Sequence, residues 1–158
     1  MRYLMMALVL SCAGAQKPAA GGPETFHANL NVASEVPPPN VGSASPTGTA
    51  TFTSDGGKIA YQVTVTGLSS AFTAAHIHGG AEGALGLVVV PLALTAGPDG
   101  TSATGAGVIE AANIKGTNPD TSPMTMNDLL NAMRSGGCYV NVHTSGNPKG
   151  EIRGQVKP

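Results

Sequence analysis

The feature that most constrains the fold is a strict alternation of apolar and polar residues in short runs that end at glycine- or proline-rich segments. The clearest run spans residues 58–66. Its large apolar members are Ile59, Tyr61, Val63 and Val65. Alternate side chains of a β-strand point to opposite faces, so this run predicts a strand with one buried and one solvated face. The segment 54–57, Ser-Asp-Gly-Gly, joins it to a similar run at 47–53, which predicts a β-hairpin.

Other runs of this kind predict that the whole domain is built from strands. We expect further strands near residues 26–32, 74–78, 87–92, 101–110, 138–143 and 151–156. The run at 87–92, Leu-Val-Val-Val-Pro-Leu, is continuously apolar, which predicts a strand buried on both faces or at the centre of a sheet. With 22 glycines and 12 prolines in 158 residues, the composition is typical of one turn-rich all-β domain.

One segment, residues 122–134, has helical spacing. Its apolar residues, which recur at intervals of three and four, are Met126, Leu129, Leu130 and Met133. Ser122 is a suitable N-cap, and Pro123 would stand at the first helical position. We therefore expect one short helix near 122–134.

The N-terminus resembles an export signal, because Arg2 precedes an apolar run from Tyr3 to Leu10. The residues Val9-Leu10-Ser11-Cys12 resemble a lipobox, in which Cys12 becomes the lipidated first residue of the mature chain. Alternatively, Ala13-Gly14-Ala15 is an A-x-A cleavage site and Cys12 is removed. Both alternatives predict export, and the lipobox also predicts a membrane anchor at the periplasmic side or the cell surface.

This interpretation divides the chain into three parts. Residues 1–12 are the signal peptide with its lipobox, residues 13–24 form a flexible tether rich in Gly, Ala and Pro, and residues 25–158 form the folded domain. The sequence has no run of 18 or more apolar residues, so no membrane-spanning helix is predicted. The formal net charge of −1 gives no reason to expect a nucleic acid as partner.

Cys138 is the only cysteine that remains once Cys12 is lipidated or removed, so no disulfide within the chain is expected. It is in phase with Val140 and Val142 and out of phase with His143. We expect it to point into the core as a small apolar side chain.

Three of the four histidines have a spacing that suits a metal site. His76 and His78 stand at positions i and i+2 of a predicted strand, so their imidazoles share one face with roughly 6–7 Å between the Cα atoms. The core-facing residues of that strand are Ala75 and Ile77, so the two imidazoles point away from the core. His143 lies in a second β-like run, and we expect all three to meet on the outer face of the sheet.

The C-terminal hairpin predicts which polar residues accompany His143. If its two arms pair symmetrically about residues 144–150, Glu151 lies opposite His143, and Arg153 lies opposite Asn141. Glu151, with Asn141 beside it, would then support the second ring nitrogen of His143, and Arg153 would guide a small anion to the site. The alternative is an ordinary ladder of cross-strand ion pairs on a solvated face.

Three neutral imidazoles favour Cu(II) or Zn(II), and copper has the higher intrinsic affinity of the two. We therefore expect copper, rather than zinc, to be the bound ion. A fourth position on the ion would accept water or superoxide. The alternative is that the histidines hydrogen-bond the loops 79–86 and 144–150 and hold no metal.

The chain resembles the CHRD domain, named from chordin, in two long segments. The first is Ala75-His76-Ile77-His78-Gly79 with Gly86-Leu87-Val88-Val89, and the second is residues 139–144 with residues 150–155. Glu35-Val36-Pro37-Pro38 also matches the usual opening of that domain. The resemblance covers about Phe26 to Val156. It implies a β-sandwich module of the bacterial cell envelope, either secreted or anchored as a lipoprotein.

The H-x-H pattern with a later V-H is also similar to the copper side of copper/zinc superoxide dismutases, which are Greek-key β-barrels with the metal outside the barrel. His76, His78 and His143 match three of the copper ligands, whereas the bridging histidine, the zinc loop and the disulfide pair have no counterpart. The resemblances imply a Greek-key sandwich or barrel and two classes of function. One is an envelope module that binds copper or a protein partner, and the other is a copper-dependent enzyme that acts on superoxide.

Overall fold

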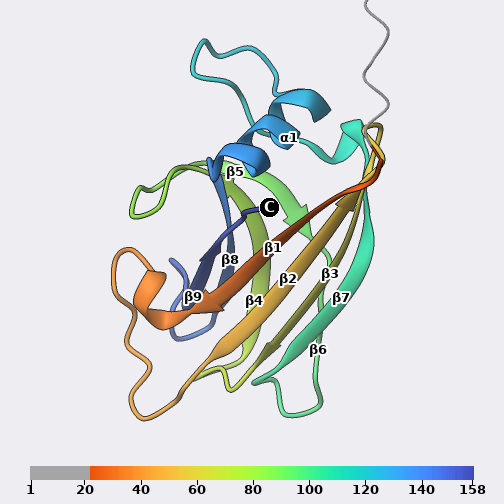
Figure 1. Ribbon diagram of the computed structural model, residues 1–158. Coiled ribbons are helices and arrows are strands. Elements are labelled where there is room, and N and C mark those ends of the chain that lie inside the picture. The colour runs from red at the N-terminus through yellow and green to blue at the C-terminus, as the bar shows by residue number, and fades with distance from the viewer. Residues whose placement is uncertain (1–21) are drawn as a thin grey trace, which may run out of the picture.

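The computed structural model describes residues 22–158, which form one antiparallel sheet curled into a half-barrel, with a short helix at one end (Figure 1). The sheet order is β5-β4-β8-β9-β1-β2-β3-β7-β6. The strands of this described part are β1 (Glu24–Asn31), β2 (Thr47–Ser54), β3 (Ile59–Thr66), β4 (Phe72–Gly79), β5 (Val88–Leu92), β6 (Thr95–Ala96), β7 (Ala103–Ile109), β8 (Cys138–Thr144) and β9 (Ile152–Gln155). The helices are the 3-10 turns η1 (Val32–Ser34) and η2 (Ala111–Asn113) and the α-helix α1 (Met126–Ser135). The prediction of an all-β fold with one short helix is confirmed.

Alternation along the strands decides which face is buried. In β3, every second residue from Ile59 to Val65 is buried and the residues between them are exposed, because successive side chains point to opposite faces. The hairpin of β2 and β3 pairs Ser54 with Ile59 and Thr47 with Thr66, as the sequence predicts. The residues on the concave face pack into one apolar core, in which Phe26, Phe52 and Ile77 are among the largest fully buried side chains.

β5 differs from its prediction, because it lies at one edge of the sheet and not at its centre. Val89 and Val90 are buried, but Leu87 and Val88 are 77% and 39% exposed. Pro91 within the strand has no backbone N–H to donate, which suits an edge position. Hydrophobic content alone therefore predicted the wrong place for this strand.

The helix also begins later than predicted. Its N-cap is Thr125, whose side chain accepts a hydrogen bond from the backbone N–H of Asp128, while the Asp128 carboxylate accepts one from the N–H of Thr125. This reciprocal pair satisfies the backbone N–H groups of Thr125 and Asp128, which have no partner within the helix. Ser122 instead hydrogen-bonds Asp120 in the preceding turn. Gly136 ends the helix at a φ of 65°, a left-handed conformation that glycine adopts without strain.

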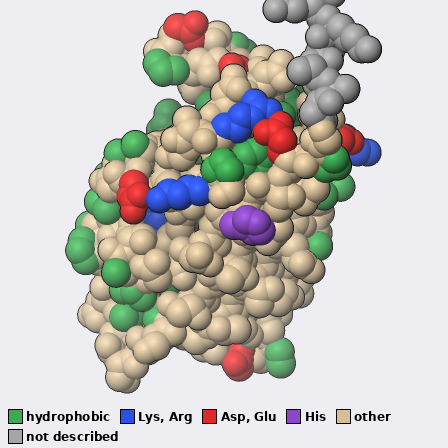
Figure 2. All heavy atoms as spheres, in the orientation of Figure 1, with side chains coloured by type: hydrophobic (Ala, Val, Ile, Leu, Met, Phe, Trp, Pro, Cys, Tyr) green, Lys and Arg blue, Asp and Glu red, His purple; other side chains and the backbone are tan. Residues whose placement is uncertain are grey.

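Charged side chains are few on the face that Figure 2 shows, and positive and negative groups lie beside each other there. Two ion pairs are formed among the described residues, Arg134 with Glu24 at 2.5 Å and Lys157 with Glu82 at 3.1 Å. Both are exposed, so each contributes little to stability.

The predicted signal peptide, residues 1–12 with Cys12, lies outside the described residues, as does most of the predicted tether, residues 13–24. Glu24, the last residue of that tether, opens β1. Within residues 22–158, no helix is both long enough and apolar enough to cross a membrane.

Candidate metal centre

The pairing of β4 with β8 brings the three predicted ligands onto one face. His76 lies opposite Asn141, His78 opposite Tyr139, and Ala74 opposite His143. Cross-strand partners share a face and diagonal neighbours on that face lie within side-chain reach, so His143 is a diagonal neighbour of His76. The alternate residues of both strands, Ala75, Ile77, Val140 and Val142, are buried in the core. The histidines therefore lie on the outer face of the sheet.

The distances are close to those that one metal ion requires. Ring centroids are 5.0 Å apart for His76 and His143, 5.7 Å for His76 and His78, and 6.0 Å for His78 and His143. One ring nitrogen from each histidine lies within 4.8 Å of the other two. Two metal–nitrogen bonds of about 2.0–2.1 Å span at most ~4.2 Å. At a tetrahedral angle two such nitrogens stand about 3.4 Å apart, so rotations of the imidazoles that close the widest pair by up to roughly 1.4 Å would complete the site.

Hydrogen bonds to backbone carbonyls occupy Nδ1 of His78 and of His143 and leave Nε2 of each ring without a partner in the described part of the chain. His78 Nδ1 lies 3.0 Å from the carbonyl oxygen of Gly86, and His143 Nδ1 lies 3.1 Å from that of Pro148. A carbonyl oxygen only accepts, so each Nδ1 carries the proton and each Nε2 of the neutral ring keeps its lone pair. Both Nε2 atoms are buried without a partner among the described residues, and so is Nδ1 of His76.

The site favours neutral imidazoles. Burial lowers the pKa of His76, and the neighbouring His78 lowers it further. Burial also lowers the pKa of His78, and the positive charge of Arg153 adds to this, although the hydrogen bond to Gly86 opposes it. Burial, with the neighbouring His76, lowers the pKa of His143 to about 4. At neutral pH the three rings are therefore uncharged and able to act as ligands without first losing a proton.

Glu151 does not support His143 directly, so this part of the prediction is wrong. Its carboxylate accepts hydrogen bonds from the Ser69 backbone and hydroxyl and from the side chains of Thr144 and Asn147. The side chain is completely buried. The carboxylate turns to these donors because a buried charge requires several hydrogen bonds, and a backbone carbonyl, that of Pro148, takes its place at the imidazole.

Arg153 does not stand at an exposed rim, which contradicts its predicted role as an anion guide. It is 1% exposed. Its guanidinium donates to the carbonyl oxygens of Ala81 and Ala84, each at 2.8 Å, and lies 3.4 Å from the centroid of the Tyr139 ring. The loop between β4 and β5 covers the face that the sequence predicted to be solvated. The predicted register, with Asn141 opposite Arg153, is nevertheless confirmed.

Asn141 reaches the site through its place in the sheet, opposite His76. Its amide donates to the Glu35 carboxylate and to the carbonyl oxygen of Ile152. Burial raises the pKa of Glu35, although hydrogen bonds from Val36 and Asn141 oppose this. Sequence reasoning missed Glu35 as a buried neighbour of the site. The signal was an acidic residue directly before Val36-Pro37-Pro38 in a segment unable to pair regularly.

Tyr139 is the second residue near the site that sequence reasoning missed. Its ring stacks on that of His78, with centroids 5.1 Å apart and an interplanar angle of 14°. The alternation along β8 puts Tyr139 and His143 on one face, but the pairing of Tyr139 with His78 depends on β4 lying next to β8. That neighbourhood joins distant parts of the chain and has no local signal.

Cys138 is buried in the core, as predicted. Burial raises the pKa of its thiol to about 12, so it is protonated at neutral pH. As it points to the opposite face of β8 from His143, it is not a ligand of this site.

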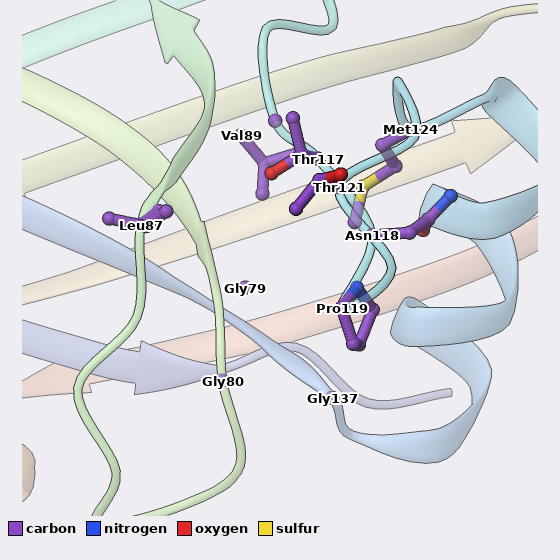
Figure 3. A pocket seen from close by; sticks show the side chains of 11 residues that line it. Gly79, Gly80, Leu87, Val89, Thr117, Asn118, Pro119, Thr121, Met124 and Gly137 are labelled. Atoms are coloured by element: carbon purple, nitrogen blue, oxygen red, sulfur yellow. The ribbon is translucent and has the colours of Figure 1, made fainter.

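An apolar cavity of about 500 Å³ lies nearby and does not include the three histidines. Figure 3 shows Leu87 on one side of it and Thr117, Thr121 and Met124 on the other, with Gly79, Gly80 and Gly137 below. Its lining offers no cluster of charged groups. Among the described residues, the groups that could hold a metal ion are therefore the three histidines and not the lining of this cavity.

Comparisons with known proteins agree with the resemblance seen in the sequence. No match was found among curated proteins or among solved structures. The family model of the CHRD domain matches residues 26–156, which is most of the chain and includes every strand of the described part except the first two residues of β1. The chain therefore belongs to the CHRD domain family.

Proposed function

We propose that this CHRD domain binds one copper ion through Nδ1 of His76 and Nε2 of His78 and of His143. The observation that carries the proposal is that these three ring nitrogens are buried and have no partner among the described residues. Buried polar atoms are paired in the great majority of cases, so three unpaired nitrogens in one cluster indicate a missing ligand. A bound cation would satisfy all three together.

The metal-free alternative explains the hydrogen bonds of two Nδ1 atoms but not the three nitrogens without a partner within residues 22–158. It predicts that the histidines hydrogen-bond the loops 79–86 and 144–150, and Gly86 and Pro148 do accept such bonds. Each bond uses Nδ1, however, and directs the lone pair of Nε2 elsewhere. Metal-ligating histidines commonly donate a hydrogen bond from the N–H of their second ring nitrogen to a backbone carbonyl in this way. The loop contacts thus support a metal site as well.

Copper fits the donor set better than other common ions. The cluster offers only imidazole nitrogens, with no thiolate or carboxylate among the described residues that could join it. Imidazole suits Cu(II) and Zn(II), and the affinity of a given site is higher for Cu(II) than for Zn(II). We therefore propose copper as the ion and zinc as its competitor.

We also propose that the protein is exported and anchored to the membrane by lipidation of Cys12. The support is the apolar run that precedes Val9-Leu10-Ser11-Cys12 and the Gly/Ala/Pro-rich segment that follows. The copper site would then face the periplasm or the cell surface. Radiolabelled palmitate incorporation, with Cys12→Ala as the control, tests the anchor.

Metal analysis of the purified chain tests the site. We expect one copper ion per chain after Cu(II) loading and dialysis, and an electron paramagnetic resonance spectrum with hyperfine splitting from several nitrogens. His76→Ala and His143→Ala should retain far less copper. His27→Ala is the matched control, because His27 is exposed and lies outside the cluster. Equal copper retention by the wild type and all three variants would contradict the proposal.

A superoxide dismutase-like activity is the second candidate. The three imidazoles are only half-buried, so part of each ring lies open to solvent beside the buried nitrogens that would hold the ion. Two superoxide ions and two protons would give dioxygen and hydrogen peroxide. Superoxide decay in the copper-loaded wild type should exceed that with the same amount of free copper and should be lost in His143→Ala. If superoxide decayed no faster than with free copper, the protein would bind copper but would not be a catalyst.

A further inference from the structure

We propose that Tyr139 and Arg153 are positioning residues that fix His78 as a metal ligand through the loop of residues 80–87. The metal readout of this inference rests on the proposed copper site, whereas the orientation of His78 is measured without metal. Three observations carry the inference. They are the stack on His78, the hydrogen bonds that hold the loop, and the separate support of His143.

The first observation is the stack of side chains on the outer face. The Tyr139 ring lies nearly parallel to the His78 imidazole, at an interplanar angle of 14°. The Arg153 guanidinium packs against the same Tyr139 ring, 3.4 Å from its centroid. Tyr139 is 3% exposed and Arg153 is 1% exposed, so neither has the freedom of a surface side chain. Stacking and cation–π contacts of this kind restrict the rotation of His78.

The second observation is that the same two residues hold the loop. Arg153 donates to the carbonyl oxygens of Ala81 and Ala84, each at 2.8 Å. The Tyr139 hydroxyl accepts a hydrogen bond of 3.2 Å from the backbone N–H of Gly86. The carbonyl oxygen of Gly86 in turn lies 3.0 Å from Nδ1 of His78. One residue of the loop therefore connects Tyr139 to the imidazole.

Gly86 has little freedom to move. A Cβ atom at this position would stand 1.4 Å from the carbonyl oxygen of Gly79. The loop backbone thus packs directly on the end of β4, and only glycine permits that approach. Since the carbonyl of Gly86 is held in place, Nδ1 of His78 keeps its proton and Nε2 keeps its lone pair for a metal.

The third observation is that His143 depends on a different loop. Its Nδ1 bonds the carbonyl oxygen of Pro148, in the connection between β8 and β9. A change in Tyr139 should therefore affect His78 and leave His143 unchanged. A general loss of structure would affect both, so the two histidines act as test and internal reference within one molecule.

The test is the tautomeric state of each imidazole in the metal-free full-length protein, measured by nitrogen-15 nuclear magnetic resonance at pH 8. Tyr139→Phe removes the hydroxyl and keeps the ring, and Tyr139→Leu removes both. We expect His78 to change from predominantly Nδ1–H to a mixture of tautomers in Tyr139→Phe, and further in Tyr139→Leu. Tyr61→Phe is the matched control, because the Tyr61 hydroxyl also accepts from a backbone N–H, that of Ala93, at 3.1 Å.

Copper titration gives the second readout. Loss of an outer partner of a ligating histidine typically weakens metal binding about 10–100-fold, and Tyr139 acts through one further residue. We expect Tyr139→Phe to weaken Cu(II) binding about tenfold and Tyr61→Phe to leave it unchanged. Arg153→Met should also weaken it, and Arg153→Lys, whose single ammonium group can still donate to a loop carbonyl, should restore part of the loss.

Two results would overturn the inference. One is a His78 tautomer that stays the same in both Tyr139 variants, and the other is an equal change at His143. A third result separates the two proposals. If the wild type binds no copper but His78 alone responds to Tyr139→Phe, the positioning role stands and the copper proposal is wrong.

Discussion

The Glu151 carboxylate accepts a hydrogen bond of 2.6 Å from the hydroxyl of Thr144, the residue that follows His143. The same carboxylate binds Ser69 and Asn147, so it ties the β8–β9 loop to the segment after β3. Because Pro148 in this loop accepts from His143, Glu151 supports the histidine through the loop backbone. It does not contact the imidazole.

The first prediction concerns this network. Glu151→Gln replaces an acceptor of four hydrogen bonds by an amide that presents its own donors to some of the same groups. Each buried donor left without an acceptor costs about 1–3 kcal/mol. We expect the free energy of unfolding, measured by urea denaturation, to fall by at least about 1–3 kcal/mol.

Glu82→Gln is the control for Glu151→Gln. Glu82 is exposed in its ion pair with Lys157, so this change should alter stability by less than about 0.5 kcal/mol. If both variants were as stable as the wild type, the network would not contribute to the fold as its geometry indicates.

The second prediction concerns pH. Burial raises the pKa of Glu35 above its ordinary value of 4.5, so the folded protein holds this proton more tightly than the unfolded chain does. As the pH rises above 4.5, the unfolded state loses the proton first, and the wild type loses stability until the folded-state pKa is passed. Glu35→Gln removes this dependence. The stability of the variant relative to the wild type should therefore increase with pH over this range.

Asp99→Asn should show the opposite trend. Hydrogen bonds from Thr101 and Ser102 lower the pKa of Asp99, so its contribution to stability is present above its ordinary pKa and is lost as the pH falls. Urea denaturation at several pH values measures both variants. A stability of Glu35→Gln that falls with pH relative to the wild type, as that of Asp99→Asn should, would show that Glu35 does not titrate as described.

The third prediction concerns the effect of copper on stability. A ligand that binds only the folded state at a hundred times its Kd adds about 2.7 kcal/mol. We expect Cu(II) to raise the Tm of the wild type and of His27→Ala, and to have little effect on His76→Ala or His143→Ala. Adding a strong chelator should return the Tm to its metal-free value. Equal stabilisation of all variants would indicate binding away from the cluster.

The fourth prediction compares two glycines of one loop. Gly86→Ala must displace the backbone, because its Cβ would collide with Gly79. Loss of a group that hydrogen-bonds a ligating histidine weakens metal binding about 10–100-fold. We therefore expect Cu(II) binding to weaken at least about tenfold. Gly83→Ala has open space but a φ of 77°, so it should cost about 1–2 kcal/mol of stability and leave copper affinity unchanged. Titration with Cu(II) and urea denaturation separate the two effects. A loss of affinity in Gly83→Ala as large as that in Gly86→Ala would contradict this role for Gly86.

Local sequence patterns predicted the strands and the face of each histidine well. Alternation along β4 and β8 is a property of the backbone itself, so His76, His78 and His143 could be placed on the outer face before their neighbours were known. The pairing of Asn141 with Arg153 also followed from the short connection between β8 and β9, and it is confirmed.

The surroundings of the histidines were predicted poorly, because they depend on segments that are far apart in the chain. Arg153 is buried because residues of the β4–β5 connection cover it, and Glu151 turns toward Ser69, which follows β3. Both residues look like solvated members of an alternating strand when only the strand is considered. A polar side chain on an outer face is exposed only where no loop folds back over it, and alternation carries no information about loops.

The strand order has a consequence for when the site can exist. β4 and β8 are hydrogen-bonded neighbours in the sheet, although β5, β6, β7 and α1 all lie between them in the chain. We expect contacts of such high sequence separation to form late, because closing a long loop costs entropy before the contacts stabilise the sheet. We therefore expect His143 to join His76 and His78 only when the sheet is nearly complete. Three-nitrogen copper coordination would accordingly serve as a spectroscopic marker of finished folding, and its appearance in a refolding experiment would time the closure of β8 against β4.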